Sequence, residues 1–103
     1  MAILVRFTPS GMTRDQYWSV GKKLEDGGHW PPPGLLAHVC FGAQGDLRVS
    51  EVWESREQQE QFSQALLPIL EEEGIGFAGE PEFLDVEAYE LKDARTDPPY
   101  PRR

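Results

Sequence analysis

The order of hydrophobic patterns along the chain most strongly limits the folds that it can adopt. Four short segments have strand-like sequences, at residues 2–7, 35–43, 47–53 and 82–89. Two others, at residues 13–27 and 55–74, repeat apolar residues every three or four positions, as amphipathic helices do. The resulting order, β-α-β-β-α-β, is typical of the split βαβ pattern. It predicts a ferredoxin-like α+β fold with a four-stranded antiparallel sheet.

Local signals support both predicted helices. Two pairs have the spacing of a capping box, Thr13 with Gln16 and Ser55 with Gln58. Gly21 lies on the apolar stripe of the first helix, where we expect it to let the helix approach the sheet closely. Pro68 lies inside the second helix and is expected to kink it or to separate its last turn. The three glutamates at 71–73 are expected to form a solvated helix end.

The middle strands are predicted to form a hairpin with a two-residue turn at residues 44–45. Counting back from this turn places His38 directly opposite Glu51. A change of one residue in the loop length would put these two side chains on opposite faces of the sheet. The candidate site therefore depends on the register of this hairpin.

Two proline-rich segments interrupt or follow the regular elements. Residues 26–34 include three consecutive prolines, which lack backbone donors and favour an extended path. We expect an ordered crossover loop here, with Trp30 anchored against apolar side chains. Residues 92–103 are polar and proline-rich without a core pattern, and they are predicted to form a C-terminal tail after a single domain at residues 1–91.

Charge and cysteine content exclude several classes of function. The net charge is −8, and basic residues cluster only at Lys22–Lys23 and Arg102–Arg103, so nucleic acid and anionic membranes are poor partners. The single cysteine, Cys40, allows no internal disulfide and no thiolate metal cluster. Two histidines without ligand spacing predict no metal site, and we expect no cofactor. The chain starts without a signal-peptide pattern and has no apolar run of membrane-spanning length, which favours the cytoplasm.

The strands are more apolar than two helices can shelter. Along the second strand, Ala37, Val39 and Phe41 point to one side, and Leu36 and Cys40 point to the other. Two helices cover only one face of a four-stranded sheet, so the other face needs a partner. A second sheet packed against it would bury this surplus, and we therefore predict a homodimer.

The stretch from Val49 to Ser55, followed by the helix that carries Phe62, resembles the dimeric α/β-barrel superfamily. That superfamily includes antibiotic biosynthesis monooxygenases and haem-degrading monooxygenases, and residues 1–89 resemble its uncharacterised bacterial members more closely. The resemblance is also carried by Phe7-Thr8-Pro9, by the segment 33–38 and by Leu67-Pro68 with Gly74-Ile75. It implies that two sheets form a barrel across a dimer, with a pocket between sheet and helices in the oxygenase members.

The haem-degrading branch is a poor match. A strand-three tryptophan lines the pocket in that branch, and Trp53 matches it. The same branch uses a helix-two histidine and a strand-one asparagine. This chain has no histidine at 57–73, and its first strand offers Arg6 but no asparagine. The resemblance therefore implies no haem chemistry here.

His38 and Glu51 are the best candidates to carry chemistry. A carboxylate opposite a histidine can hold the imidazole in one tautomer and favour proton uptake from an acidic phenol or enol. Trp53, Tyr17 and Phe62 would then line a pocket for a small aromatic or organic-acid ligand. The alternative is that His38 is merely hydrogen-bonded in the core and that these three rings are core packing.

Three functions remain open from the sequence alone. The first is a cofactor-independent oxygenase or an isomerase with His38 as base and Glu51 as its orienter. The second is a non-catalytic, ligand-binding or stress-related dimer, and the third is a structural module with a closed core. A cavity beside a hydrogen-bonded His38–Glu51 pair would favour the first two functions, and solid packing there would favour the third.

Overall fold

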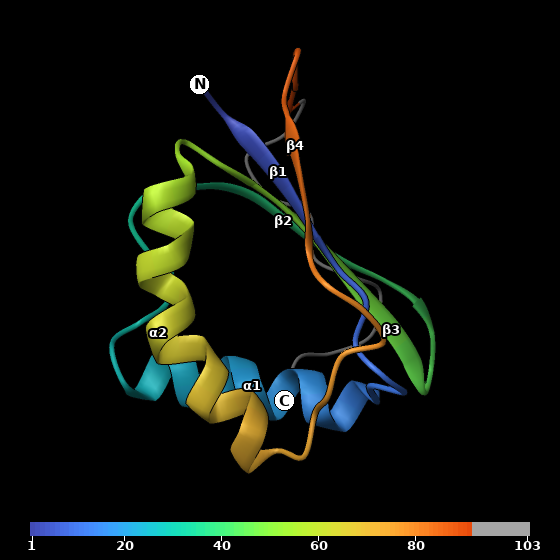
Figure 1. Ribbon diagram of the computed structural model, residues 1–103. Coiled ribbons are helices and arrows are strands. Elements are labelled where there is room, and N and C mark those ends of the chain that lie inside the picture. The colour runs from blue at the N-terminus through green and yellow to red at the C-terminus, as the bar shows by residue number, and fades with distance from the viewer. Residues whose placement is uncertain (92–103) are drawn as a thin grey trace.

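The computed structural model describes residues 1–91, so the predicted tail at 92–103 lies outside the described residues. The elements are β1 (Ile3–Phe7), α1 (Arg14–Asp26), β2 (Leu35–Ala43), β3 (Asp46–Trp53), α2 (Arg56–Glu72) and β4 (Glu82–Asp85). The predicted β-α-β-β-α-β order is confirmed. Figure 1 shows the sheet on one side of the molecule and both helices on the other.

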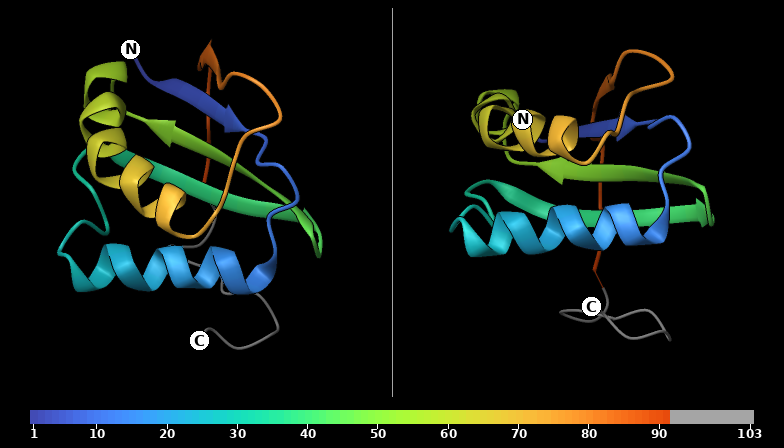
Figure 2. Two further views of the ribbon diagram at one scale, coloured as in Figure 1. Left: turned by 60° about the horizontal axis from the view of Figure 1, so that its bottom comes forward. Right: turned by 90° about the horizontal axis from the view of Figure 1, so that it is seen from below.

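The four strands form one antiparallel sheet in the order β2-β3-β1-β4. Both helices lie against the same face of this sheet, as Figure 2 shows from two further directions. The ferredoxin-like fold class is therefore confirmed. The pairing of two such sheets across a dimer concerns a second copy and stays a prediction.

The hairpin between β2 and β3 has the predicted register. Ala43 pairs with Asp46 across the two-residue turn, and His38 pairs with Glu51. The register shifts only between Leu35 and Ala37, at the far end of β2. His38 and Glu51 consequently lie side by side on the helix-covered face.

Both helices begin at the predicted caps. The Thr13 hydroxyl accepts from the Gln16 backbone N–H at 3.1 Å, and the Gln16 side chain accepts from the Thr13 backbone N–H at 2.9 Å. Ser55 accepts from the backbone N–H of Gln58 at 3.3 Å. Helix α2 continues through Pro68 without a break, and its C-terminal half bends away from the first half in Figure 1. The expected kink is present, and the last turn is not separated.

The outer strand β4 ends four residues earlier than predicted. Its last ladder pair joins Asp85 to Ile3, the first residue of β1, and one further bond runs from the Val86 N–H to the Ala2 carbonyl at 3.0 Å. Beyond this point β4 has no strand residue opposite it, so the alternating sequence at 86–89 does not form a ladder. The side chain that packs on the core is Phe83, while Leu84 points to the uncovered face.

Strand β1 is covered on one face rather than on two within the described chain. Ile3 and Val5 are buried beneath the helices, whereas Leu4 is half-buried and Arg6 is exposed on the other face. Residues 1–91 of one chain therefore leave the second face of β1 open to solvent.

Large rings fill much of the space between sheet and helices. Trp53 is fully buried, and its ring centroid lies 5.5 Å from that of Phe62. The ring centroid of Trp30 lies 6.0 Å from that of Phe62, which confirms that Trp30 anchors the crossover loop against apolar side chains. These rings hold the helices away from the strands.

Gly21 does not bring α1 close to the sheet. A Cβ atom built at this position meets no atom within 4 Å outside the local helix backbone. The expectation of a close approach was wrong, because bulky side chains elsewhere set the separation.

The open space at Gly21 predicts a stabilising substitution. Gly21→Ala should raise the free energy of unfolding by about 0.5–1 kcal/mol, since alanine loses less conformational freedom in a helix than glycine does. Urea unfolding followed by circular dichroism would measure the change. A lower unfolding midpoint in the variant would show that the site is more crowded than its geometry indicates.

The acidic end of α2 is only partly solvated. Glu73 lies 2.8 Å from Lys23 Nζ and accepts from the Ser19 hydroxyl at 2.8 Å. The hydrogen bonds from Lys23 and Ser19 lower the pKa of Glu73, and the bond to Glu73 raises the pKa of Lys23. This pair ties the end of α2 to α1, while Glu71 and Glu72 remain exposed.

Candidate functional site

A buried carboxylate lies at the centre of the helix-covered face. Glu51 is 4% exposed and receives two hydrogen bonds on its two oxygens. His38 Nδ1 lies 2.7 Å from Oε2, and Trp53 Nε1 donates to Oε1 at 3.1 Å. Alternation along β3 puts Glu51 and Trp53 on one face, and the hairpin register puts His38 beside them. A carboxylate this deep needs such donors to offset the cost of burial.

His38 links this carboxylate to α1. Its Nε2 atom lies 2.7 Å from the Tyr17 hydroxyl, and the two rings are stacked with centroids 6.0 Å apart. An ionised carboxylate only accepts hydrogen bonds, so Nδ1 carries a proton and donates to Glu51. In a neutral imidazole, Nε2 then accepts from Tyr17. The side chains form a continuous chain from Trp53 through Glu51 and His38 to Tyr17.

The structure brings all five predicted site residues into one cluster. Phe62 contacts the ring of Trp53, and Trp30, which the sequence predicts only to pack against apolar side chains, adds a sixth member. The rings of Trp30 and His38 are nearly perpendicular, at 79°, with centroids 5.2 Å apart.

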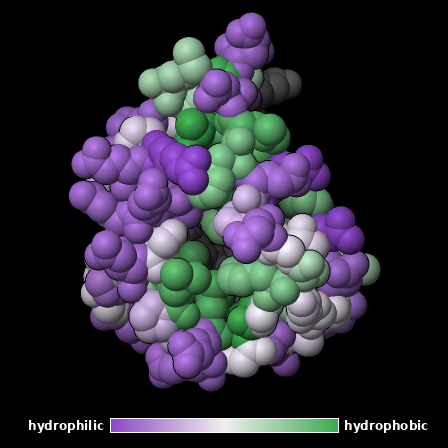
Figure 3. All heavy atoms as spheres, viewed as in Figure 1, coloured by the Kyte–Doolittle hydropathy of each residue, from purple (hydrophilic) through white to green (hydrophobic). Residues whose placement is uncertain are grey.

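A hollow of about 180 Å³ lies between the crossover loop and α2. Its lining residues are Gly28, His29, Pro31, Pro32, Pro33, Gln58, Gln61 and Phe62. Of the predicted site residues only Phe62 lines it. Viewed along the space between sheet and helices, the surface also shows a central depression bordered by both hydrophobic and hydrophilic residues (Figure 3). His38 and Glu51 are therefore in contact with each other, but neither of them lines the hollow.

Cys40 packs on the core. It lies on the same face as His38, and burial raises the pKa of its thiol to about 11. A protonated, half-buried thiol is a poor nucleophile. The structure thus gives Cys40 a packing role.

The raised pKa predicts slow alkylation of Cys40. At pH 8 a thiol with a pKa near 11 is about 0.1% ionised, against roughly a quarter for a free cysteine. Labelling by iodoacetamide should therefore be on the order of 100-fold slower in the folded protein than in urea. Equal rates in the two conditions would contradict the burial of this thiol.

Metal-binding side chains do not gather within residues 1–91. No group of three or more His, Cys, Asp or Glu side chains there could hold a metal ion. Within the same residues, no helix is both long and apolar enough to span a membrane.

Comparison with known proteins defines the class of fold. The chain has the fold of antibiotic biosynthesis monooxygenase-like proteins, which confirms the resemblance at the level of architecture. A putative antibiotic biosynthesis monooxygenase from Chloroflexus aurantiacus matches 85% of this chain and 97% of its own, with 17% identity and a TM-score of 0.57. SnoaB from Streptomyces nogalater, described as a cofactor-independent oxygenase, matches 89% of this chain and 96% of its own, with 16% identity and a TM-score of 0.55.

A third structure, a protein named YJCS, matches 84% of this chain and all of its own, with 12% identity and a TM-score of 0.61. No family model matches the sequence, and no curated protein matches it. At these identities the likeness shows the fold alone. The function must be argued from this chain's own side chains.

Proposed function

We propose that this protein binds a small phenol or enol and removes its proton, as the first step of a cofactor-independent monooxygenation. One observation carries the proposal: the buried Glu51 carboxylate lies 2.7 Å from His38 Nδ1. This contact orients the imidazole and would stabilise the positive charge that His38 gains on taking up a proton. His38 is the base, and Glu51 orients it. The rings of Trp53, Tyr17 and Phe62 form the walls of the proposed substrate pocket.

Proton removal makes the substrate a better electron donor to dioxygen. For a 1,4-quinol, the overall reaction is quinol plus O₂ giving hydroxyquinone plus water. One oxygen atom enters the ring, and the other leaves as water with the two hydrogens. The likeness to SnoaB, described as a cofactor-independent oxygenase, supports this class of chemistry. An isomerase would use the same first step and return the proton to another atom of the anion.

Oxygen uptake tests the proposal directly. With 1,4-naphthoquinol as the probe, we expect the protein to consume oxygen above the uncatalysed rate and to form hydroxynaphthoquinone. His38→Ala should reduce the turnover by about 10²–10⁴-fold, the usual contribution of a general base. Circular dichroism must show that the variant stays folded. Full turnover in the folded variant would overturn the role of His38.

A second function is favoured by the separation between His38 and the hollow. Both imidazole nitrogens already have protein partners, and the hollow is lined by neither His38 nor Glu51. This arrangement suits a non-catalytic protein, either ligand-binding and stress-related or purely structural. Binding of naphthoquinol without oxygen uptake, detected by a thermal shift, would favour this alternative.

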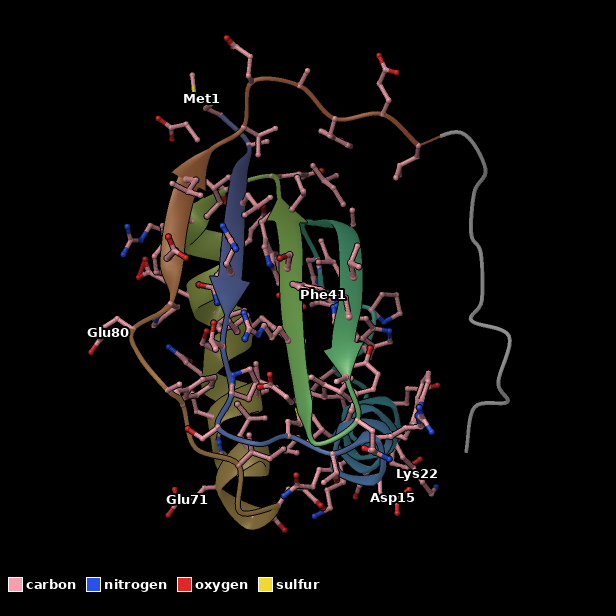
Figure 4. The ribbon with its side chains drawn as sticks, turned by 90° about the vertical axis from the view of Figure 1, so that its right-hand side faces the viewer. Met1, Asp15, Lys22, Phe41, Glu71 and Glu80 are labelled. Carbon is pink, nitrogen blue, oxygen red and sulfur yellow. The ribbon has the colours of Figure 1, made fainter. Side chains whose placement is uncertain are left out.

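We also propose that the uncovered face of the sheet binds a second copy of the chain. Figure 4 looks onto this face, where Phe41 is labelled on β2. Val39 is 54% exposed, Phe41 41% and Leu84 47%, and no element of residues 1–91 covers them. Such a patch of large apolar side chains is typical of an interaction surface.

Charge favours a second copy over an oppositely charged partner. The same face carries two arginines and two acids in two ion pairs, Arg6 with Glu82 at 3.9 Å and Arg48 with Asp46 at 3.5 Å. Their charges cancel, although the whole chain has a net charge of −8. Two copies can therefore meet at this face without repulsion between like charges.

A further inference from the structure

We infer that the hollow between the crossover loop and α2 is a binding site for a molecule with one aromatic ring and an uncharged oxygen acceptor, such as an aryl ketone. Neither His38 nor Glu51 lines this hollow, so the site is independent of the proposed oxygenation. Three features of the hollow carry the inference: its size, its apolar walls and one oriented amide.

The size of the hollow suits a single ring. It has a volume of about 180 Å³ and is partly open to solvent. An apolar cavity of about 150 Å³ is enough to hold one benzene molecule. Pockets for drug-sized ligands are larger, at about 300–1,000 Å³. One aromatic ring with a short substituent is therefore the largest ligand that this hollow can enclose.

Apolar and stiff groups form much of the walls. The three prolines at residues 31–33 line the hollow from the loop, and the ring of Phe62 lines it from α2. A proline ring fixes its own backbone φ angle, so this part of the loop has little freedom to collapse into the hollow. Phe62 is buried, and its ring also packs against those of Trp53 and Trp30. The walls are thus formed before a ligand arrives, and binding loses little conformational entropy.

Gln58 supplies an oriented hydrogen-bond donor to these walls. Its side-chain oxygen accepts from the Ser55 hydroxyl at 3.0 Å. The same side chain packs against the backbone of Gly34, where a Cβ atom would lie only 2.5 Å from the amide carbon of Gln58. These contacts hold the amide in place and leave its nitrogen without an acceptor among residues 1–91. A ligand oxygen can therefore accept a hydrogen bond from this nitrogen.

The hollow offers little to an ionised ligand. None of the described residues that line it is Lys, Arg, Asp or Glu, and the one histidine among them, His29, is exposed to solvent. The whole chain has a net charge of −8, which repels anions. A carboxylate would lose hydration at these walls without gaining a charged partner. The ligand oxygen is therefore expected on an uncharged group.

Titration of acetophenone into ¹⁵N-labelled protein tests the site. Acetophenone has one ring, one carbonyl acceptor and no charge. We expect the amide signals of residues 28–30 and 58–62 to shift, while those of His38 and Glu51 stay in place. Benzoate, which is similar in size but ionised at pH 8, should bind at least about 10-fold more weakly. Shifts confined to His38 and Glu51, no shift at all, or equal binding of benzoate would overturn the inference.

Substitution of Gln58 tests the oriented donor. Gln58→Leu removes the amide and should raise the Kd of acetophenone about 3–10-fold, the usual effect of losing one neutral hydrogen bond. The matched control, Gln64→Leu, makes the same change at an exposed position of α2 that does not line the hollow, and it should leave the Kd unchanged. An unaltered Kd in a folded Gln58→Leu protein would overturn the role of the amide. If this variant does not fold, the titration of the unaltered protein decides the inference. Absence of oxygen uptake would overturn only the proposed function, because acetophenone binding does not involve His38.

Discussion

Replacing Trp53 by alanine is expected to lower the free energy of unfolding by about 3–5 kcal/mol, as other tryptophan-to-alanine changes in cores do. The side chain is fully buried, packs on Phe62 and donates to Glu51. The free energy of unfolding of a small domain is only about 5–15 kcal/mol in total, so the variant should be close to unfolding. Urea titration at one fixed protein concentration would measure the loss.

Trp53→Phe separates the indole hydrogen bond from the burial of the ring. Phenylalanine keeps most of the apolar contact but removes the donor to the Glu51 carboxylate. Hydrogen bonds to charged groups contribute about 1.5–3 kcal/mol, so we expect a loss of that size. A Trp53→Ala protein with the unfolding midpoint of the unaltered chain would show that the centre of this core is misassigned.

Adding a charge to the uncovered sheet face is expected to convert a dimer into a monomer. Val39 lies halfway along the edge strand β2, on this face, and is half exposed in one copy. Val39→Glu would place a buried, unpaired carboxylate in the proposed interface and a solvated one in a monomer. Analytical ultracentrifugation should give twice the chain mass of 11.7 kDa for the unaltered protein and the single mass for the variant.

Gln64→Glu is the matched control for this experiment. It adds the same charge at an exposed position on α2, on the helix side of the molecule, and should leave the dimer intact. A monomeric unaltered protein would overturn the dimer proposal. Equal effects of the two substitutions would show that net charge, rather than the sheet face, controls assembly.

The parts of the fold that depend on local sequence were predictable. Capping at Thr13 and the two-residue turn involve neighbouring residues, and both are found as expected. The end of β4 depends instead on where β1 starts, a contact between segments about eighty residues apart. The error at Gly21 has a similar cause, because the distance between helix and sheet is set by rings elsewhere in the chain.

The candidate site also has one part that the sequence predicts and another that it does not. Hairpin register was sufficient to place His38 beside Glu51, since both belong to adjacent strands. The bond from Tyr17 to Nε2 and the contact with Trp30 depend on how α1 and the crossover loop pack on the sheet. No sequence spacing encodes these distances. These contacts change the chemistry open to His38. The Tyr17 hydroxyl occupies Nε2, the nitrogen that the sequence alone left available as a base.

The proposed function requires the His38–Glu51 pair to take a proton from a bound phenol. The absorption spectrum of bound 4-nitrophenol tests it most directly, because the phenol and the phenolate absorb at different wavelengths. At a pH well below that at which the free probe ionises, the unaltered protein should hold the phenolate, and His38→Gln should hold the phenol. A probe that binds the unaltered protein as neutral phenol would contradict the claim.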